Sequence, residues 1–144
     1  MQFSYPYTTE KSGVTTLVEF PDVPGAVTEV RKDEHAQALI RDCLLAALGG
    51  YMTRKRPPPR PSPARGRPVV VLDLVTSAKL ALASEMAGQG ISNVALAERL
   101  GVSEKVVRRL LDPDHHCLID RLEAALGVLG VQVRLTVQRA SRVA

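Results

Sequence analysis

Five residues in the C-terminal half of the chain carry groups that proteins use to contact nucleic acid. They are Ser103, Glu104, Lys105, Arg108 and Arg109. A serine hydroxyl at a helix start binds phosphate, arginine forms a bidentate contact with guanine, and glutamate accepts a hydrogen bond from cytosine. A helix that begins after Ser103 would present Glu104, Lys105 and Arg108 on its outward side. We therefore take these five residues as candidate DNA-binding residues.

The surrounding stretch LAERLGVSEKVVRRLLDP, Leu96 to Pro113, predicts two short helices joined by a tight turn at Gly101. A helix-turn-helix motif needs such a turn, and the small Ala97 lets the two helices approach closely. The expected apolar seam consists of Leu96, Leu100, Val102, Val107 and Leu110. A simpler interpretation is a solvated charged face, because Glu104 and Arg108 are spaced to pair with each other. The combination of seam, glycine turn and basic face favours DNA binding.

Charge is distributed unevenly over the 144 residues, whose formal net charge is +4 and whose pI is about 9.4. The stretch 54–67 has no acidic residue and contains the basic residues Arg54, Lys55, Arg56, Arg60, Arg65 and Arg67. The remainder of the first 72 residues has four basic and seven acidic groups, a net charge of −3. From Asp73 onward there are nine basic and eight acidic groups. DNA affinity there must therefore come from a local patch, since the bulk charge is nearly neutral.

The basic stretch RKRPPPRPSPARGRP is predicted to be a loop. Its five prolines between Pro57 and Pro63 favour extended polyproline II geometry with solvated guanidinium groups. A solvated connector is the favoured interpretation. Contact with nucleic acid or an acidic protein, or binding to a proline-recognition module, remain open alternatives.

The first 73 residues are predicted to form a β-β-β-α-β unit. Aromatic residues stand at every second position from Phe3 to Tyr7, which predicts a strand with one apolar face. A turn is expected after it, at 11–13. The helix should begin at a cap formed by Asp33, with Glu34 in its first turn, and run for about 18 residues. The other strands are expected at Val14–Phe20, Ala26–Val30 and Val69–Leu72, with a break at the PDVPG stretch 21–25.

The remaining chain, 74–144, reads as four helices followed by a strand. Helix caps are expected at Thr76 or Ser77, at Ser92 and at Ser103, and the fourth helix is expected at His115–Leu129. Alternating apolar residues then predict a strand at 131–138. A lone strand after four helices has no partner in its own domain, so it is expected to pair with a second copy of the chain.

Several classes of protein are disfavoured by what the sequence lacks. No apolar run approaches the roughly 20 residues of a membrane span, and Cys43 and Cys117 lie in apolar helical patterns typical of reduced, buried thiols. A cytoplasmic protein is therefore expected. His115 and His116 are neighbours that point in different directions, so no metal site is expected there. The acidic residues of the strands form no cluster that could hold catalytic metal ions, so neither an enzyme nor a cofactor is expected.

Two longer stretches resemble known families. ALAERLGVSEKVVRRLLDPDHHCLIDRLEAALGVLGV is similar to a lambda-repressor-like helix-turn-helix domain, a likeness that covers most of 74–137. VEFPDVPGAVTEV with the helix after it resembles the HicB antitoxin domain, over about 1–73. The resemblance implies an α+β protein with a partial ribonuclease-H-like domain at 1–73 and a helix-turn-helix domain at 74–144. It implies that the first domain masks a small HicA-type mRNA-cleaving toxin, at a contact surface that the sequence does not identify. The second would repress the shared operon as a homodimer or tetramer.

Two other interpretations use the same residues. A stand-alone transcriptional regulator would keep the DNA-binding half and use the first domain to sense a small ligand, which requires a closed apolar pocket. A purely structural protein would use the C-terminal helices and strand only for dimerisation. Replacing Arg108 would then leave operator affinity unchanged.

Overall fold

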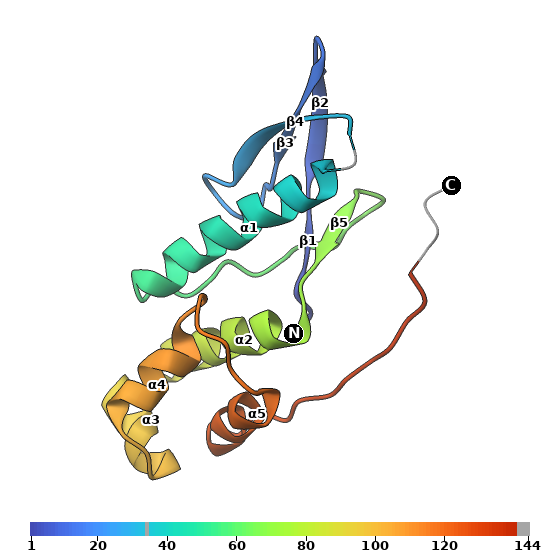
Figure 1. Ribbon diagram of the computed structural model, residues 1–144. Helices are drawn as coiled ribbons and strands as arrows, with labels where there is room; N and C mark the ends of the chain where they lie inside the picture. Colours follow the sequence, from blue (N-terminus) through green and yellow to red (C-terminus); the bar gives the residue numbers. More distant parts are fainter. Residues whose placement is uncertain (34, 141–144) are drawn as a thin grey trace.

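The computed structural model describes residues 1–33 and 35–140, and it is an α+β fold with two small antiparallel sheets followed by helices (Figure 1). One sheet pairs β1 with β5, and the other has the order β2-β3-β4. The strands are β1 Ser4–Pro6, β2 Thr8–Ser12, β3 Thr15–Glu19, β4 Val27–Arg31 and β5 Val69–Val71. The predicted first strand is thus divided at Tyr7, whose amide donates to the carbonyl of Pro68. Pro6 lacks an amide hydrogen, which suits the end of a short edge ladder.

The hairpin turn between β2 and β3 begins at Gly13, the last residue of the predicted turn 11–13, and extends one residue beyond it. Ser12 pairs with Thr15, so Gly13 and Val14 form the turn. Gly13 has a φ of 61°, which a glycine adopts without a steric penalty. Val14 is 83% exposed at the tip, so the predicted strand Val14–Phe20 begins one residue too early. Val18 and Phe20 are buried as expected.

The helix α1, Ala36–Thr53, lies against one face of the three-stranded sheet and buries Ile40, Leu44 and Leu48 (Figure 1). Asp33 does not cap it, because His35 occupies the N-cap position. The Asp33 carboxylate instead accepts a hydrogen bond from the His35 amide, at 2.8 Å, in the turn before the helix. Glu34, predicted for the first turn, lies outside the described residues.

The helix α2, Leu74–Gln89, begins earlier than predicted. Its cap is Asp73, not Thr76 or Ser77. The Asp73 carboxylate accepts hydrogen bonds from the Thr76 amide at 2.9 Å and the Thr76 hydroxyl at 2.7 Å. Asp73 stands three residues before Thr76, so its carboxylate can accept from an amide of the first turn that has no partner within the helix. This explains why the helix starts earlier than predicted. The helix ends at Gly90 in the left-handed conformation.

Three shorter helices follow: α3 Asn93–Leu100, α4 Glu104–Leu111 and α5 Ile119–Val128. The prediction that the last helix begins at His115 is wrong. Residues 112–115 form a turn in which the His115 amide donates to the Asp112 carbonyl and the Asp114 amide to the Asp112 carboxylate. The carbonyls of Asp112 and His115 both accept from the buried Lys79 ammonium group. The chain becomes helical only beyond this turn.

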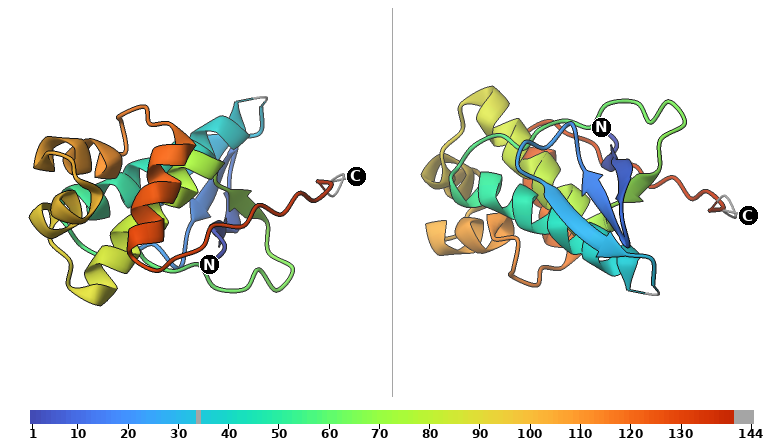
Figure 2. Two further views of the ribbon diagram at one scale, coloured as in Figure 1. Left: turned by 90° about the horizontal axis from the view of Figure 1, so that it is seen from below. Right: turned by 90° about the horizontal axis from the view of Figure 1, so that it is seen from above.

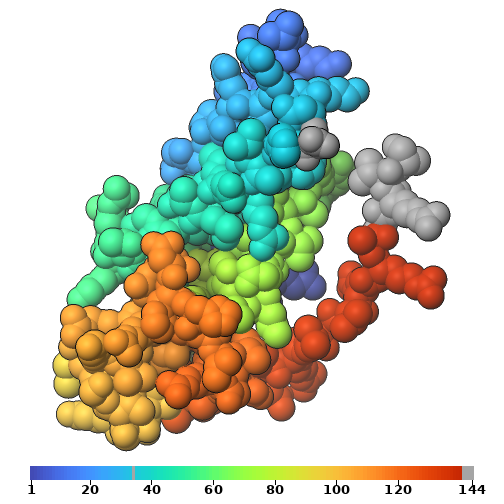
Figure 3. Space-filling model, in the orientation of Figure 1, coloured from blue at the N-terminus to red at the C-terminus, as the bar shows by residue number. Residues whose placement is uncertain are grey.

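Residues 131–140 are assigned to neither a helix nor a strand, so the predicted C-terminal strand is absent from the single chain. Val131 and Val133 still pack against the helices. Beyond them the segment leaves the body of the molecule, with Leu135 and Val137 exposed (Figure 3). A strand requires a ladder partner, and no described segment of the same chain provides one here.

Two hydrophobic cores lie on opposite sides of α2. The first joins the sheets with α1 and includes Leu80 of α2. The second joins α2 with α3, α4 and α5 and includes Leu82. Because α2 contributes side chains to both cores, it fixes the N-terminal sheets relative to the C-terminal helices (Figure 2). In the described part of the chain, no helix is both long and apolar enough to cross a membrane.

Candidate functional site

The candidate residues lie on α4 and at the turn that precedes it. Gly101 ends α3 with a φ of 67°, and the extended Ser103 then begins α4. At the start of α3, the Ser92 hydroxyl accepts a hydrogen bond from the Ala95 amide, so this predicted cap is confirmed. The Ser103 hydroxyl makes no such bond to its own helix, although Ser103 is the N-cap residue. Its exposed hydroxyl therefore remains available to another acceptor or donor.

One side of α4 is buried and the other is basic. Leu96, Val107 and Leu110 are buried between the helices, whereas Leu100 is half-buried and Val102 is 39% exposed. The predicted seam is therefore correct except at Val102, which lies in the turn. The exposed cations of the helix are Lys105, Arg108 and Arg109.

The structure brings Glu104 and Arg108 together. Their carboxylate oxygen Oε1 and guanidinium nitrogen Nε are 3.4 Å apart, with the two side chains 42% and 62% exposed respectively. An exposed pair at this spacing contributes only about 0.3–0.5 kcal/mol. Such a weak pair opens readily when either group finds a stronger partner. The ion pair therefore leaves both side chains able to contact a polar ligand.

Lys79 is a residue that supports α4 and that the sequence did not single out. Only 3% of this residue is exposed, and its ammonium group donates to the carbonyls of Asp112 and His115, directly after α4. A cation near the last carbonyls of a helix is favourable because the helix dipole is negative there. Lys79 thus holds the C-terminal end of α4 to α2. The available signal was a lysine within the otherwise apolar run AKLALA.

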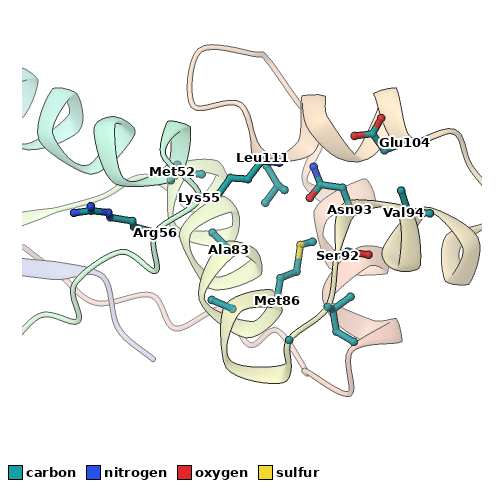
Figure 4. A pocket seen from close by; sticks show the side chains of 13 residues that line it. Met52, Lys55, Arg56, Ala83, Met86, Ser92, Asn93, Val94, Glu104 and Leu111 are labelled. Atoms are coloured by element: carbon teal, nitrogen blue, oxygen red, sulfur yellow. The ribbon is translucent and has the colours of Figure 1, made fainter.

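A groove of about 480 Å³ lies between the C-terminal end of α1 and the helices α3 and α4, and both the first residue of α4, Glu104, and its last, Leu111, line it (Figure 4). Lys55 and Arg56 line it from the α1 side, Asn93 and Glu104 line it from the other helices, and Met86 of α2 also contributes. The groove therefore places residues of the N-terminal unit beside the helix that carries the candidate residues.

The Pro-rich loop between α1 and β5 is anchored to the first unit, which corrects its predicted role as a solvated connector. The Tyr5 hydroxyl donates to the Pro59 carbonyl at 2.7 Å. The Asp22 carboxylate accepts from the amide and the hydroxyl of Ser62, at 2.8 and 2.9 Å. Burial, with a smaller contribution from the Asp22 charge, raises the pKa of Tyr5 to about 12. Pro58 is buried as well, so the loop is part of the packed structure.

The two cysteines are free thiols, with Cys117 buried and Cys43 half-buried. Burial raises the pKa of the Cys43 thiol. His115 and His116 belong to no group of three potential metal ligands within the described part of the chain.

No family model matches the chain. Antitoxin HicB 2 of Photorhabdus laumondii subsp. laumondii is 32% identical over 131 residues, which span 91% of this chain and 94% of that protein. Antitoxin HicB of Pseudomonas fluorescens is 36% identical over 101 residues, 69% of each protein. Antitoxin HicB of Escherichia coli K12 is 28% identical over 120 residues, 83% of this chain and 87% of that protein.

These relatives define the class of this α+β protein, which is an antitoxin of a toxin–antitoxin system. More specifically, the chain belongs to the HicB antitoxin family. Relatives named as antitoxins are consistent with a regulatory, non-catalytic role.

Proposed function

We propose that this antitoxin masks a small HicA-type mRNA-cleaving toxin with its N-terminal domain, residues 1–73, and represses its own operon with its C-terminal domain, residues 74–144. In this proposal α3 and α4 act as a helix-turn-helix, and α4 enters the major groove of the operator. The observation that carries the DNA-binding part is the exposed row of Lys105, Arg108 and Arg109 on a helix packed by its opposite side.

The sheet β2-β3-β4 offers the surface that we propose for the toxin. Glu10 and Glu29 both stand opposite Leu17 in the strand register, so all three share the face turned away from the buried Val18. Glu19 lies on the same face, and all three glutamates are exposed. Arg31 adds one positive charge at the end of β4, so the face is negative overall. A protein that binds RNA presents a basic surface, which this acidic face complements.

Charge reversal tests the toxin-masking part. We expect expression of the small gene beside this one to stop growth, and co-expression of the antitoxin to restore it. The double variant Glu10→Lys and Glu29→Lys should lose this protection, whereas Glu123→Lys on the exposed side of α5 should keep it. A harmless neighbouring gene would contradict the antitoxin proposal. Protection retained by the double variant would contradict the assignment of the surface.

Operator binding by Arg108→Ala tests the DNA-reading part. We expect the variant to lose about 1–3 kcal/mol of binding free energy and to discriminate less between the operator and a mismatched duplex. A gel-shift titration at fixed salt measures both quantities. Unchanged affinity and discrimination would show that α4 does not read the operator and would favour a purely structural role for these helices.

A further inference from the structure

Three consecutive cations, Arg54, Lys55 and Arg56, lie where α1 ends, and we call them the basic end of α1. All three are exposed. The ion pairs between described residues are Arg41 with Asp73 and Arg108 with Glu104, so the basic end of α1 has no carboxylate partner there. Cations at a helix C-terminus offset the helix dipole, which is the simplest explanation for them. That explanation does not account for their position beside α3 and α4.

The basic end of α1 faces the helices that we propose to bind DNA. Lys55 and Arg56 line one wall of the groove described above, and Asn93 and Glu104 line the opposite wall. Figure 4 shows Lys55 extending from α1 toward Leu111 of α4. Glu104 is the acidic residue of the groove, and its charge is offset by the pair with Arg108. The groove is therefore positive on one wall and close to neutral on the other.

The backbone of Lys55 adopts a conformation that favours glycine. Its φ is 53°, its amide donates to the Met52 carbonyl, and the Arg56 amide donates to the Tyr51 carbonyl. This is the hydrogen-bond pattern of a Schellman motif, in which the left-handed position is usually glycine. A lysine there carries a steric cost that glycine would avoid. Arg65 in the same loop has a similar φ of 49°, so the backbone does not distinguish Lys55, but it makes glycine a fitting replacement at either position.

We propose that the basic end of α1 binds the phosphodiester backbone of the operator beside the major groove that α4 enters. This inference rests on the proposed DNA binding by α4. A row of unpaired cations next to a recognition helix matches the row of phosphates that flanks a groove. The N-terminal domain would thereby position the duplex without reading its sequence.

The variant Lys55→Gly tests this contact with little risk of misfolding, because glycine relieves the left-handed backbone while it removes the charge. Arg65→Gly is a matched control. Arg65 is an exposed cation of the same loop, and its φ is 49°. The stretch that enters β5 lies away from α3 and α4 in both Figure 1 and Figure 2. Both variants lose one positive charge and both should be at least as heat-stable as the parent.

Operator binding is measured by fluorescence anisotropy over a series of salt concentrations. For Lys55→Gly we expect a several-fold loss of affinity at low salt and a decrease of about 1 per bound chain in the slope of log affinity against log salt. Discrimination between the operator and a mismatched duplex should not change. Arg65→Gly should leave affinity, slope and discrimination as in the parent.

The possible outcomes separate this inference from the proposed function. An unchanged slope for Lys55→Gly, together with lost discrimination for Arg108→Ala, would overturn the phosphate contact and leave α4 as the reader. An equal decrease for Lys55→Gly and Arg65→Gly would show an effect of net charge and would also overturn it. If Arg108→Ala keeps full discrimination, the proposed function fails and this inference fails with it.

Discussion

Lys79 shows how one residue can connect two parts of the molecule. It lies on α2 between Leu80, which faces the first core, and Ala78, which belongs to the second. Its ammonium group is out of solvent and is satisfied by two backbone carbonyls after α4. A buried charge is tolerated only when it has such partners. The same bonds prevent those carbonyls from facing the core unpaired.

Lys79→Met should lower the free energy of unfolding by about 1–3 kcal/mol. The methionine fills similar space, but the carbonyls of Asp112 and His115 lose their donor. Urea denaturation followed by circular dichroism measures the change. The same substitution at the exposed Lys11 is the control and should change stability by no more than about 0.5 kcal/mol. Equal stability of both variants would show that the Lys79 hydrogen bonds contribute nothing.

At the scale of the elements, the N-terminal cap of α2 also connects this helix to α1. Asp73 caps it and also forms an ion pair with Arg41 of α1 at 3.0 Å, so the cap joins two helices. Burial alone would raise the pKa of the Asp73 carboxyl. The hydrogen bonds from Thr76 and the charge of Arg41 outweigh burial, and the pKa lies below its ordinary value of 3.8. The ionised form is therefore the one that the folded state prefers.

Asp73→Ala should cost about 0.5–2 kcal/mol of unfolding free energy at pH 7, because the first turn of α2 loses its cap. A lowered carboxyl pKa contributes stability above the ordinary pKa, and that contribution is lost as the pH falls through the folded-state value. The difference between parent and variant should therefore narrow as the pH drops below 3.8. Urea denaturation at pH 7 and in a series below pH 4 measures this.

Asp73→Asn serves as the control for the cap. Asparagine caps helices about as well as aspartate but carries no charge, so Asp73→Asn should keep most of the stability at pH 7. The parent should lose its remaining advantage over Asp73→Asn as the pH drops below 3.8, because asparagine does not titrate. A gap between the parent and Asp73→Ala that is the same at every pH would contradict the assigned pKa direction.

At the scale of the whole molecule, the C-terminal segment leaves apolar side chains exposed. Leu135 and Val137 are 70% and 85% exposed on a segment that is neither helix nor strand in the single chain. Apolar and polar residues alternate along this segment, which is the pattern that predicted a strand at 131–138. We propose that two copies of the segment pair with each other, which gives each one its missing ladder partner.

Leu135→Asp should convert the proposed pair of chains to a monomer, because it places a charge on the apolar side of the proposed paired strands. Thr136→Asp is the matched control, since its side chain alternates to the other side and should leave the assembly intact. Light scattering after size-exclusion chromatography measures the mass of each. A parent chain that is already monomeric would refute the pairing, as would a Leu135→Asp variant with the parent mass.

The sequence alone determined the short helices and the residues that begin and end them. The hydrophobic spacing and the residues Ser92, Gly101 and Ser103 predicted α3 and α4 almost to the residue, because caps and left-handed turns depend on neighbours within about four positions. The same helical spacing predicted that Lys105 and Arg108 face outward, and both are exposed. The sequence also carried the resemblance to HicB antitoxins, a family that the relatives confirm.

Only the tertiary structure decided the contacts between distant segments. Asp22 meets Ser62 across 40 positions, and Lys79 meets Asp112 and His115 across 33 and 36. No local pattern determines such pairs, because they depend on how segments far apart in the sequence pack against each other. The groove beside Lys55 arises in the same way. Residues 131–138 have the alternation of a strand but form none in the single chain, because a strand forms only when a second backbone lies beside it.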